Sequence, residues 1–129
     1  MTPRLQQKLY KKYPKIFRQK DLSMLETAMC WGIACGDGWY WLLDALCNYL
    51  KCSHEDVEAV QVKEKFGTLR FYIQGGTSEA DAVIQFAEQM SGGICERCGM
   101  PGAKLRGKGW LYTRCNTCWK NHEKGKGGV

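Results

Sequence analysis

The sequence predicts an α+β fold in which a small helix-and-hairpin domain precedes a C-terminal ribbon that carries four cysteines. Three observations support this prediction. Apolar residues recur at helical spacing over 39–51, and apolar and polar residues alternate over 60–73 as they do in an antiparallel hairpin. Two Cys-x-x-Cys pairs then follow between residues 95 and 118. A chain of 129 residues is long enough for one compact domain, with or without a small appendage.

The first expected element is a helix that starts at Thr2 and Pro3, because threonine favours the N-cap and proline the first helical position. This helix should end at Tyr13, since the residue before a proline avoids the helical region. The apolar segment that begins at Leu22 shows no decisive period. It therefore fits a helix or a buried strand equally well.

A glycine-rich turn precedes the main core helix. Gly32, Gly36 and Gly38 surround Asp37 and mark a place where the backbone comes close to another group. Asp37 is then expected to act as the N-cap of the helix over 39–51.

The hairpin over 60–73 places its apolar side chains on one face, and a glycine pair at 75–76 stops its second strand. Ser78 and Asp81 form a capping-box pattern, which opens a second amphipathic helix. A further glycine pair at 92–93 ends that helix and leads into the ribbon.

Charge is distributed unevenly along the chain. Residues 1–20 carry seven basic and no acidic side chains, residues 21–94 carry four basic and eleven acidic ones, and residues 95–129 carry eight basic and two acidic ones. Two basic ends indicate either a face for polyanions or ends that fold back on the acidic middle. Solvated surface lysines are the plain alternative.

We therefore expect three parts. Residues 1–93 form a basic N-terminal helix and the α+β body, residues 94–122 form the ribbon, and residues 123–129 form a flexible basic tail.

The two Cys-x-x-Cys pairs have the spacing of a four-thiolate zinc site. Gly99 suits the tight turn after the first pair, and the intervening residues can fold as a hairpin that returns the second pair to the first. Four thiolates complete the coordination shell, so the expected cofactor is one structural Zn²⁺. A disulfide pair or a redox dithiol are the alternatives. The expected ligands are Cys95, Cys98, Cys115 and Cys118.

The remaining cysteines leave a second metal site open. Cys30, Cys35, Cys47 and Cys52 repeat a Cys-x4-Cys spacing, but a free thiol on the apolar face of a helix is an ordinary core residue. His122 follows the last cysteine closely and competes as a ligand only if one thiolate is displaced.

The N-terminus lacks the apolar region of a signal peptide, and no apolar run approaches the length of a membrane span. We therefore expect a reducing cytosol, no membrane partner, and cysteines present as thiols or thiolates.

Four strings carry a resemblance to a known family. They are Tyr-Pro-Lys-Ile-Phe at 13–17, Met-Cys-Trp-Gly-Ile-Ala-Cys-Gly-Asp-Gly-Trp-Tyr at 29–40, Val-Lys-Glu-Lys-Phe-Gly-Thr-Leu-Arg-Phe-Tyr at 62–72 and Ile-Cys-Glu-Arg-Cys-Gly-Met-Pro-Gly at 94–102. On these strings the chain resembles a widespread family of small, functionally uncharacterised bacteriophage and prophage proteins. The resemblance implies action in the cytoplasm of a bacterial host, in host takeover or counter-defence, and transfers no activity and no site.

Aromatic and basic residues suggest a ligand-binding site. Three tryptophans separated by glycines can build an aromatic cleft for a planar ligand, or they can fill the core. Basic residues on the polar face of the hairpin can bind phosphates, or they can form a solvated strand face. The candidate ligand-binding residues are Trp31, Asp37, Trp39, Trp41, Lys63, Lys65 and Arg70.

Catalytic motifs are weak. The sequence holds no phosphate-binding loop of the P-loop type, no His-Glu-x-x-His and no Gly-x-Ser-x-Gly, and it leaves open whether the protein is an enzyme while favouring a binding protein. The expected partner is nucleic acid or a nucleotide signal, and the alternative is a host bacterial protein that the chain inhibits by docking on it.

Overall fold

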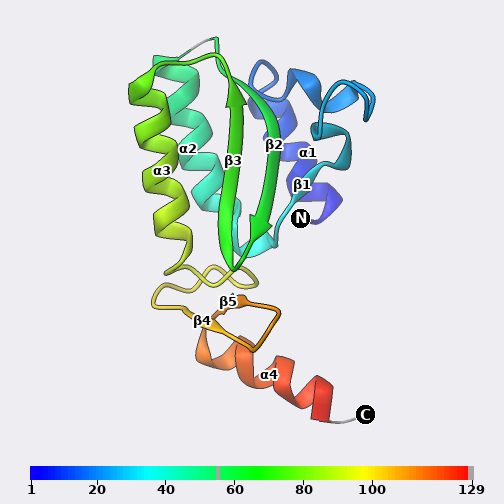
Figure 1. Ribbon diagram of the computed structural model, residues 1–129, viewed down its shortest axis with the longest axis vertical. Coiled ribbons are helices and arrows are strands. Elements are labelled where there is room, and N and C mark those ends of the chain that lie inside the picture. The colour runs from blue at the N-terminus through cyan, green and yellow to red at the C-terminus, as the bar shows by residue number, and fades with distance from the viewer. Residues whose placement is uncertain (55, 128–129) are drawn as a thin grey trace.

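The predicted α+β fold is confirmed by the computed structural model, which describes residues 1–54 and 56–127 (Figure 1). The described residues form two small sheets and several helices. The α-helices are α1 (Pro3–Lys12), α2 (Tyr40–Ser53), α3 (Ser78–Ser91) and α4 (Asn116–Gly127). Short 3-10 helices are η1 (Arg18–Asp21), η2 (Met29–Trp31) and η3 (Asp37–Trp39).

The main sheet has the strand order β1-β2-β3. Strands β2 (Glu58–Lys65) and β3 (Thr68–Gln74) form the predicted antiparallel hairpin. Strand β1 (Ile33–Ala34) runs parallel to β2, with Ile33 opposite Val62. The sequence did not predict β1, because a two-residue strand is too short to show alternation.

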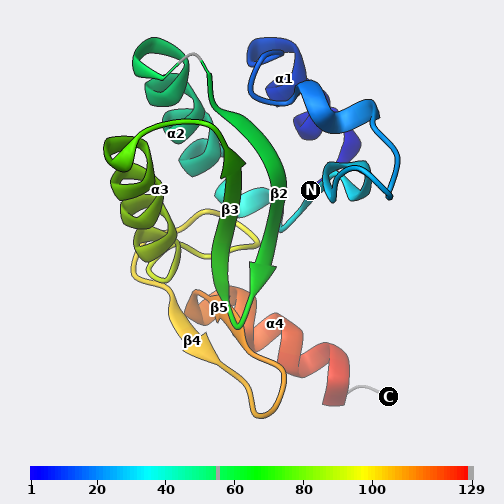
Figure 2. The same ribbon diagram turned by 45° about the horizontal axis from the view of Figure 1, so that its top comes forward.

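Helices α2 and α3 lie side by side along one face of the β2-β3 hairpin (Figures 1 and 2). The strands turn Val62, Leu69 and Phe71 towards this helical layer, where each is at most 2% exposed. Among the described residues no α-helix covers the opposite face, on which Tyr72 is 42% exposed. The sheet therefore has one buried face and one open face.

Helix α1 is joined to α2 by a buried tyrosine. The Tyr13 hydroxyl donates hydrogen bonds to the Asp44 carbonyl oxygen at 2.9 Å and to its carboxylate Oδ1 at 2.6 Å. Lys12 Nζ lies 2.9 Å from the same carboxylate oxygen. Burial opposes ionisation of Asp44, but the bonds from Tyr13 and Lys12 outweigh it and lower the pKa of the carboxyl group.

Two predicted caps are corrected by the structure. Asp37 does not cap α2, because η3 intervenes before the helix; instead its Oδ1 accepts a hydrogen bond of 2.7 Å from the backbone N–H of Thr2. Helix α3 is capped by Thr77 rather than Ser78, since the Thr77 hydroxyl accepts a bond from the N–H of Ala80. In both cases the predicted cap lies one or more residues away from the residue at which the backbone enters the helix.

The ribbon, residues 94–122, contains the predicted hairpin of β4 (Lys104–Arg106) and β5 (Tyr112–Arg114). Helix α4 then begins within the second cysteine pair and continues over 123–127, which sequence analysis assigned to the tail. Residues 128 and 129 lie outside the described residues. Helix α4 lies at the end of the molecule away from the α2 and α3 layer (Figure 1).

None of the helices in residues 1–54 and 56–127 is both long and apolar enough to cross a bilayer.

Removing the Tyr13 hydroxyl should weaken the junction between α1 and α2. For Tyr13→Phe we expect the free energy of unfolding to fall by about 1–3 kcal/mol, because the buried Asp44 carboxylate loses a hydrogen-bond donor. Urea denaturation followed by circular dichroism measures this change. Tyr72→Phe is the matched control, since Tyr72 is 42% exposed on the open face. Equal denaturation midpoints for the two variants would contradict the role of Tyr13.

Candidate functional site

The two cysteine pairs converge in the ribbon. Cys95 and Cys98 lie in the turn before β4, Cys115 directly follows β5, and Cys118 lies in the first turn of α4. The four sulfur atoms all lie within 4.8 Å of one another, and the Sγ atoms of Cys98 and Cys115 are 3.7 Å apart. This cluster can hold one metal ion.

Backbone N–H groups stabilise the ionised form of one cysteine in the cluster. Burial opposes ionisation of Cys95, but hydrogen bonds from the N–H groups of Cys115, Cys98 and Arg97 outweigh it and lower the pKa of its thiol to about 6. Burial and the neighbouring thiols instead raise the pKa of Cys118 to about 12. An ionised Cys95 favours the binding of a cation, and a bound metal would ionise the remaining thiols.

The other four cysteines do not assemble into a second cluster among the described residues. Cys30 donates to the carbonyl oxygen of Thr27, Cys52 is exposed, and Cys35 and Cys47 are buried. Burial raises the pKa of Cys35 to about 12, so it is a core thiol rather than a metal-binding thiolate.

The ribbon docks on the glycine-rich turn of the body. Gly38 N–H donates to the Glu96 carbonyl oxygen at 2.7 Å, and Gly36 N–H donates to the Glu96 carboxylate at 2.8 Å. A Cβ atom on Gly38 would lie 2.1 Å from the carbonyl oxygen of Cys95, and one on Gly36 would lie 2.3 Å from that of Glu96. The glycines are required because the backbone between Cys95 and Cys98 of the cluster lies directly against them.

Trp39 strengthens the same junction. Its side chain is 0% exposed, and its indole Nε1 donates a hydrogen bond of 2.9 Å to the carbonyl oxygen of Ile94, the residue before Cys95.

The carboxyl group of Glu96 at this junction is harder to ionise than a free one. Burial raises its pKa, and the nearby Glu64 raises it further.

A second docking point lies at the tip of the β2-β3 hairpin. The Thr113 hydroxyl in β5 donates to the carbonyl oxygen of Gly67, and Thr113 is 0% exposed. A Cβ atom on Gly67 would lie 2.4 Å from Leu105 Cδ1 in β4. The strings quoted above that contain Gly36 and Gly67 therefore each contact the ribbon.

The aromatic residues expected to bind a ligand are separated in the structure. Trp39 belongs to the core, whereas Trp31 is 68% exposed and lines a hollow with Lys20. Trp41 is 75% exposed and lines a different hollow, next to α1. Asp37 lines a polar hollow of about 480 Å³ beside the ribbon. These four residues do not surround one cavity.

The basic residues of the hairpin are partly brought together. Lys63 and Arg70 are directly opposite each other on β2 and β3, and Lys65 lies opposite Thr68 at the hairpin tip. Lys63 and Arg70 form no ion pair with another described residue. Whether these cations contact a ligand stays a prediction.

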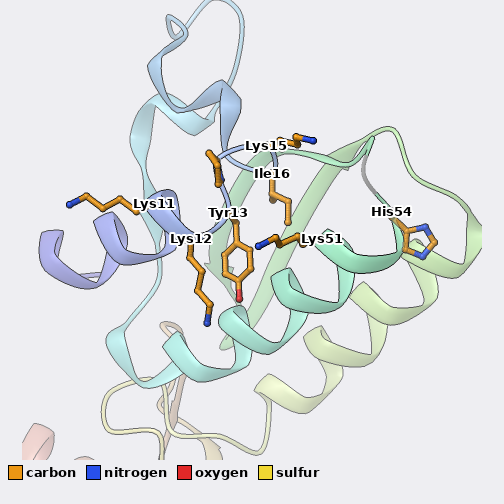
Figure 3. A pocket seen from close by; sticks show the side chains of 8 residues that line it. Lys11, Lys12, Tyr13, Lys15, Ile16, Lys51 and His54 are labelled. Carbon is orange, nitrogen blue, oxygen red and sulfur yellow. The ribbon is translucent and has the colours of Figure 1, made fainter.

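A groove lined with lysines runs between α1 and α2. One hollow of about 390 Å³ and another of about 440 Å³ share Lys11 and Lys12. Figure 3 shows Lys12 at the end of α1 and Tyr13 directly after it extending towards α2, with Lys51 reaching back from α2. We call this continuous surface the lysine groove; its cations are Lys8, Lys11, Lys12, Lys15 and Lys51.

The charge pattern indicated a basic arm, residues 1–20, but no pattern singled out three residues that the structure makes prominent. Lys51 lies at the end of α2 and joins the arm only in three dimensions. Phe66 and Trp110 are 65% and 69% exposed and line one cleft. A signal was present for Phe66, because a Phe-Gly pair stands where a two-residue hairpin turn favours Asn-Gly.

The fold and site define an α+β protein whose ribbon, docked on the body, carries a four-cysteine cluster that can hold one metal ion. A scan of protein-family models, a search of curated proteins and a search of solved structures each yield no match to the chain.

Replacing Gly38 by alanine should break the docking of the ribbon. The new Cβ atom would lie 2.1 Å from the Cys95 carbonyl oxygen, so we expect Gly38→Ala to lower the free energy of unfolding by at least about 2 kcal/mol. Thermal denaturation measures the change. Gly125→Ala is the matched control, because nothing lies within 4 Å of a Cβ atom there. A Gly38→Ala protein as stable as the control would show that the close approach is unimportant.

Proposed function

We propose that this chain is a non-catalytic, zinc-stabilised protein of phage type that binds nucleic acid. The lysine groove carries this proposal, because five lysines line this surface and Asp44 is the single acidic side chain among the described residues that line it. That acid, Asp44, is buried and already paired with Lys12. The groove therefore presents a net positive charge with no internal counterion for most of its lysines.

Zinc is the metal that best fits the cysteine cluster. A tetrahedral site with Zn–S bonds of about 2.3 Å requires sulfur atoms roughly 3.8 Å apart. The Sγ atoms of Cys98 and Cys115 are 3.7 Å apart. With four thiolates the ion has no open position for water, so it holds the ribbon together and performs no chemistry. One bound Zn²⁺ also suits the thiolate character of the donor set.

The shape of the groove favours a polymer over a single nucleotide. The two hollows share Lys11 and Lys12, so phosphates spaced along a chain can contact lysines in both. Trp41, 75% exposed beside Tyr40, offers an aromatic face next to these cations. Cations that follow a backbone, together with an aromatic surface, are the usual means of binding nucleic acid without sequence preference.

The proposed setting is the cytoplasm of a bacterial host. The resemblance of four sequence strings to small phage and prophage proteins supports a role in host takeover or counter-defence. Binding a nucleic acid is compatible with either role, since both act on host or phage genomes and transcripts.

Removing one cysteine of the cluster should abolish metal binding. For Cys98→Ser we expect zinc content to fall from one ion per chain to nearly none, because a neutral hydroxyl replaces a thiolate ligand. Native mass spectrometry of the purified protein measures the stoichiometry. Cys52→Ser, also at an exposed cysteine but outside the cluster, should keep its zinc. Equal zinc content in both variants would exclude the assignment.

Reversing two charges in the lysine groove should weaken nucleic-acid binding. For Lys11→Glu with Lys15→Glu we expect at least tenfold lower affinity for an oligonucleotide and a shallower dependence of affinity on salt. Fluorescence anisotropy at several salt concentrations measures both. Lys120→Glu with Lys124→Glu on α4 makes the same change in net charge and is the control. Wild-type affinity that is indifferent to salt would overturn the proposed function.

A further inference from the structure

The turn of the β2-β3 hairpin holds an aromatic residue in a costly conformation. Phe66 has φ 53° and is followed by Gly67 with φ 85°, the pattern of a two-residue turn in which both positions favour Asn or Gly. A non-glycine residue with positive φ is disfavoured, most of all when the side chain is bulky. Phe66 is 65% exposed, so core packing does not explain why phenylalanine occupies this position.

A second exposed aromatic residue lies across a cleft from Phe66. The cleft has a volume of about 230 Å³ and is lined by the hairpin turn on one side and by Gly109, Trp110 and Leu111 of the ribbon on the other. Trp110 is 69% exposed. Docking of the ribbon at Gly67 fixes the two segments relative to each other, so the cleft is built by parts of the chain more than forty residues apart.

Cations surround one side of this cleft. Lys65 lines it, with its Nζ 5.5 Å from the centroid of the Phe66 ring. Lys63 lies two residues earlier on the same open face of the sheet and is directly opposite Arg70. Two like charges directly opposite each other on neighbouring strands are unfavourable unless an anion lies between them.

The charges near the cleft lack partners within the described part of the chain. Arg70 Nε is buried without a hydrogen-bond partner, and neither Arg70 nor Lys63 forms an ion pair. Glu64 is the one acidic side chain that lines the cleft, and its carboxylate already accepts a hydrogen bond of 2.7 Å from Gly67 N–H. The surface therefore combines an apolar slot with more positive than negative charge, since Lys63, Lys65 and Arg70 outnumber Glu64.

We infer that the cleft between Phe66 and Trp110 takes a base of a single-stranded nucleic acid, whose adjoining phosphates contact Lys65, Lys63 and Arg70. This inference rests on the proposed function and specifies the form of the nucleic acid. A duplex hides the faces of its bases within its own stack, whereas a single strand offers them to aromatic side chains. The unpaired cations select a phosphate-bearing ligand over an apolar peptide.

The test uses the full-length, metal-loaded protein and an oligothymidylate of about twelve nucleotides, within the range of single-strand sites. Phe66→Asn removes the ring while giving the turn a residue that tolerates positive φ, so its melting temperature should equal or exceed that of the wild type. We expect its affinity for the single strand to fall about tenfold, the size expected for the loss of one base–aromatic stack. Trp110→Ala should have a similar effect.

Two controls isolate stacking from charge. Phe86→Ala removes an aromatic ring on α3 that is 64% exposed, and it should leave the affinity unchanged. A strand of the same length without bases, and a duplex, should bind the wild type more weakly than the oligothymidylate and should not distinguish Phe66→Asn from the wild type.

The outcomes separate this inference from the proposed function. If the wild type binds no oligonucleotide at all, the proposed function fails and the inference fails with it. A second outcome overturns only the stacking inference. In that outcome the wild type binds the oligothymidylate and the Lys11→Glu, Lys15→Glu protein binds it more weakly, but Phe66→Asn binds it as tightly as the wild type does. The strand without bases then also binds the wild type as tightly as the oligothymidylate does.

Discussion

The structure depends on a backbone contact that only glycine permits. Gly38 N–H meets the carbonyl oxygen of Glu96 at 2.7 Å, and Glu96 stands between two cysteines of the cluster, Cys95 and Cys98. The contact fixes the cysteine cluster next to the start of α2 and brings Ile94 within reach of the Trp39 indole. A segment as short as the ribbon has little core of its own, so this junction positions it, and a metal ion in the cluster would add to its stability.

The second junction, at Gly67, holds the ribbon against the exposed turn of the β2-β3 hairpin. Because Thr113 holds the hairpin turn, the ribbon loop with Trp110 is held at a defined distance from Phe66. The lysine groove is built differently, from α1 and α2 through Tyr13 and Asp44. The two surfaces proposed to bind nucleic acid are therefore organised by separate parts of the structure.

Sequence patterns predicted the elements whose signals are local. The helix over 39–51, the hairpin over 60–73 and the spacing of the cysteines each depend on residues close together in the chain, and the structure contains all three features. Strand β1 and helix α4 were missed, because one is too short for a period and the other has few apolar residues. Asp37 was predicted to be a cap because the sequence pattern shows only its close neighbours. Its actual hydrogen-bond partner, Thr2, lies 35 residues away in the chain.

The same limit applies to the candidate site. The glycines around Asp37 correctly indicated a close approach of the backbone, but nothing in the local pattern identified residue 96 as the partner. The helical spacing over 39–51 already placed Trp39 on the apolar face of the core helix, and the structure buries it there, whereas Trp31 and Trp41 are exposed. The pattern did not show that these two lie over different hollows. Lys51 joins the basic arm only through tertiary packing.

The order of the junction along the chain has a consequence for biosynthesis. The N–H of Gly36 and the indole of Trp39 are made 60 and 55 residues before the acceptors they meet in the ribbon. On a ribosome these donors stay hydrated while the body collapses, because their acceptors do not yet exist. The ribbon can therefore dock only after the body has been synthesised, and a metal ion held by its four cysteines would act on this later step rather than on the first.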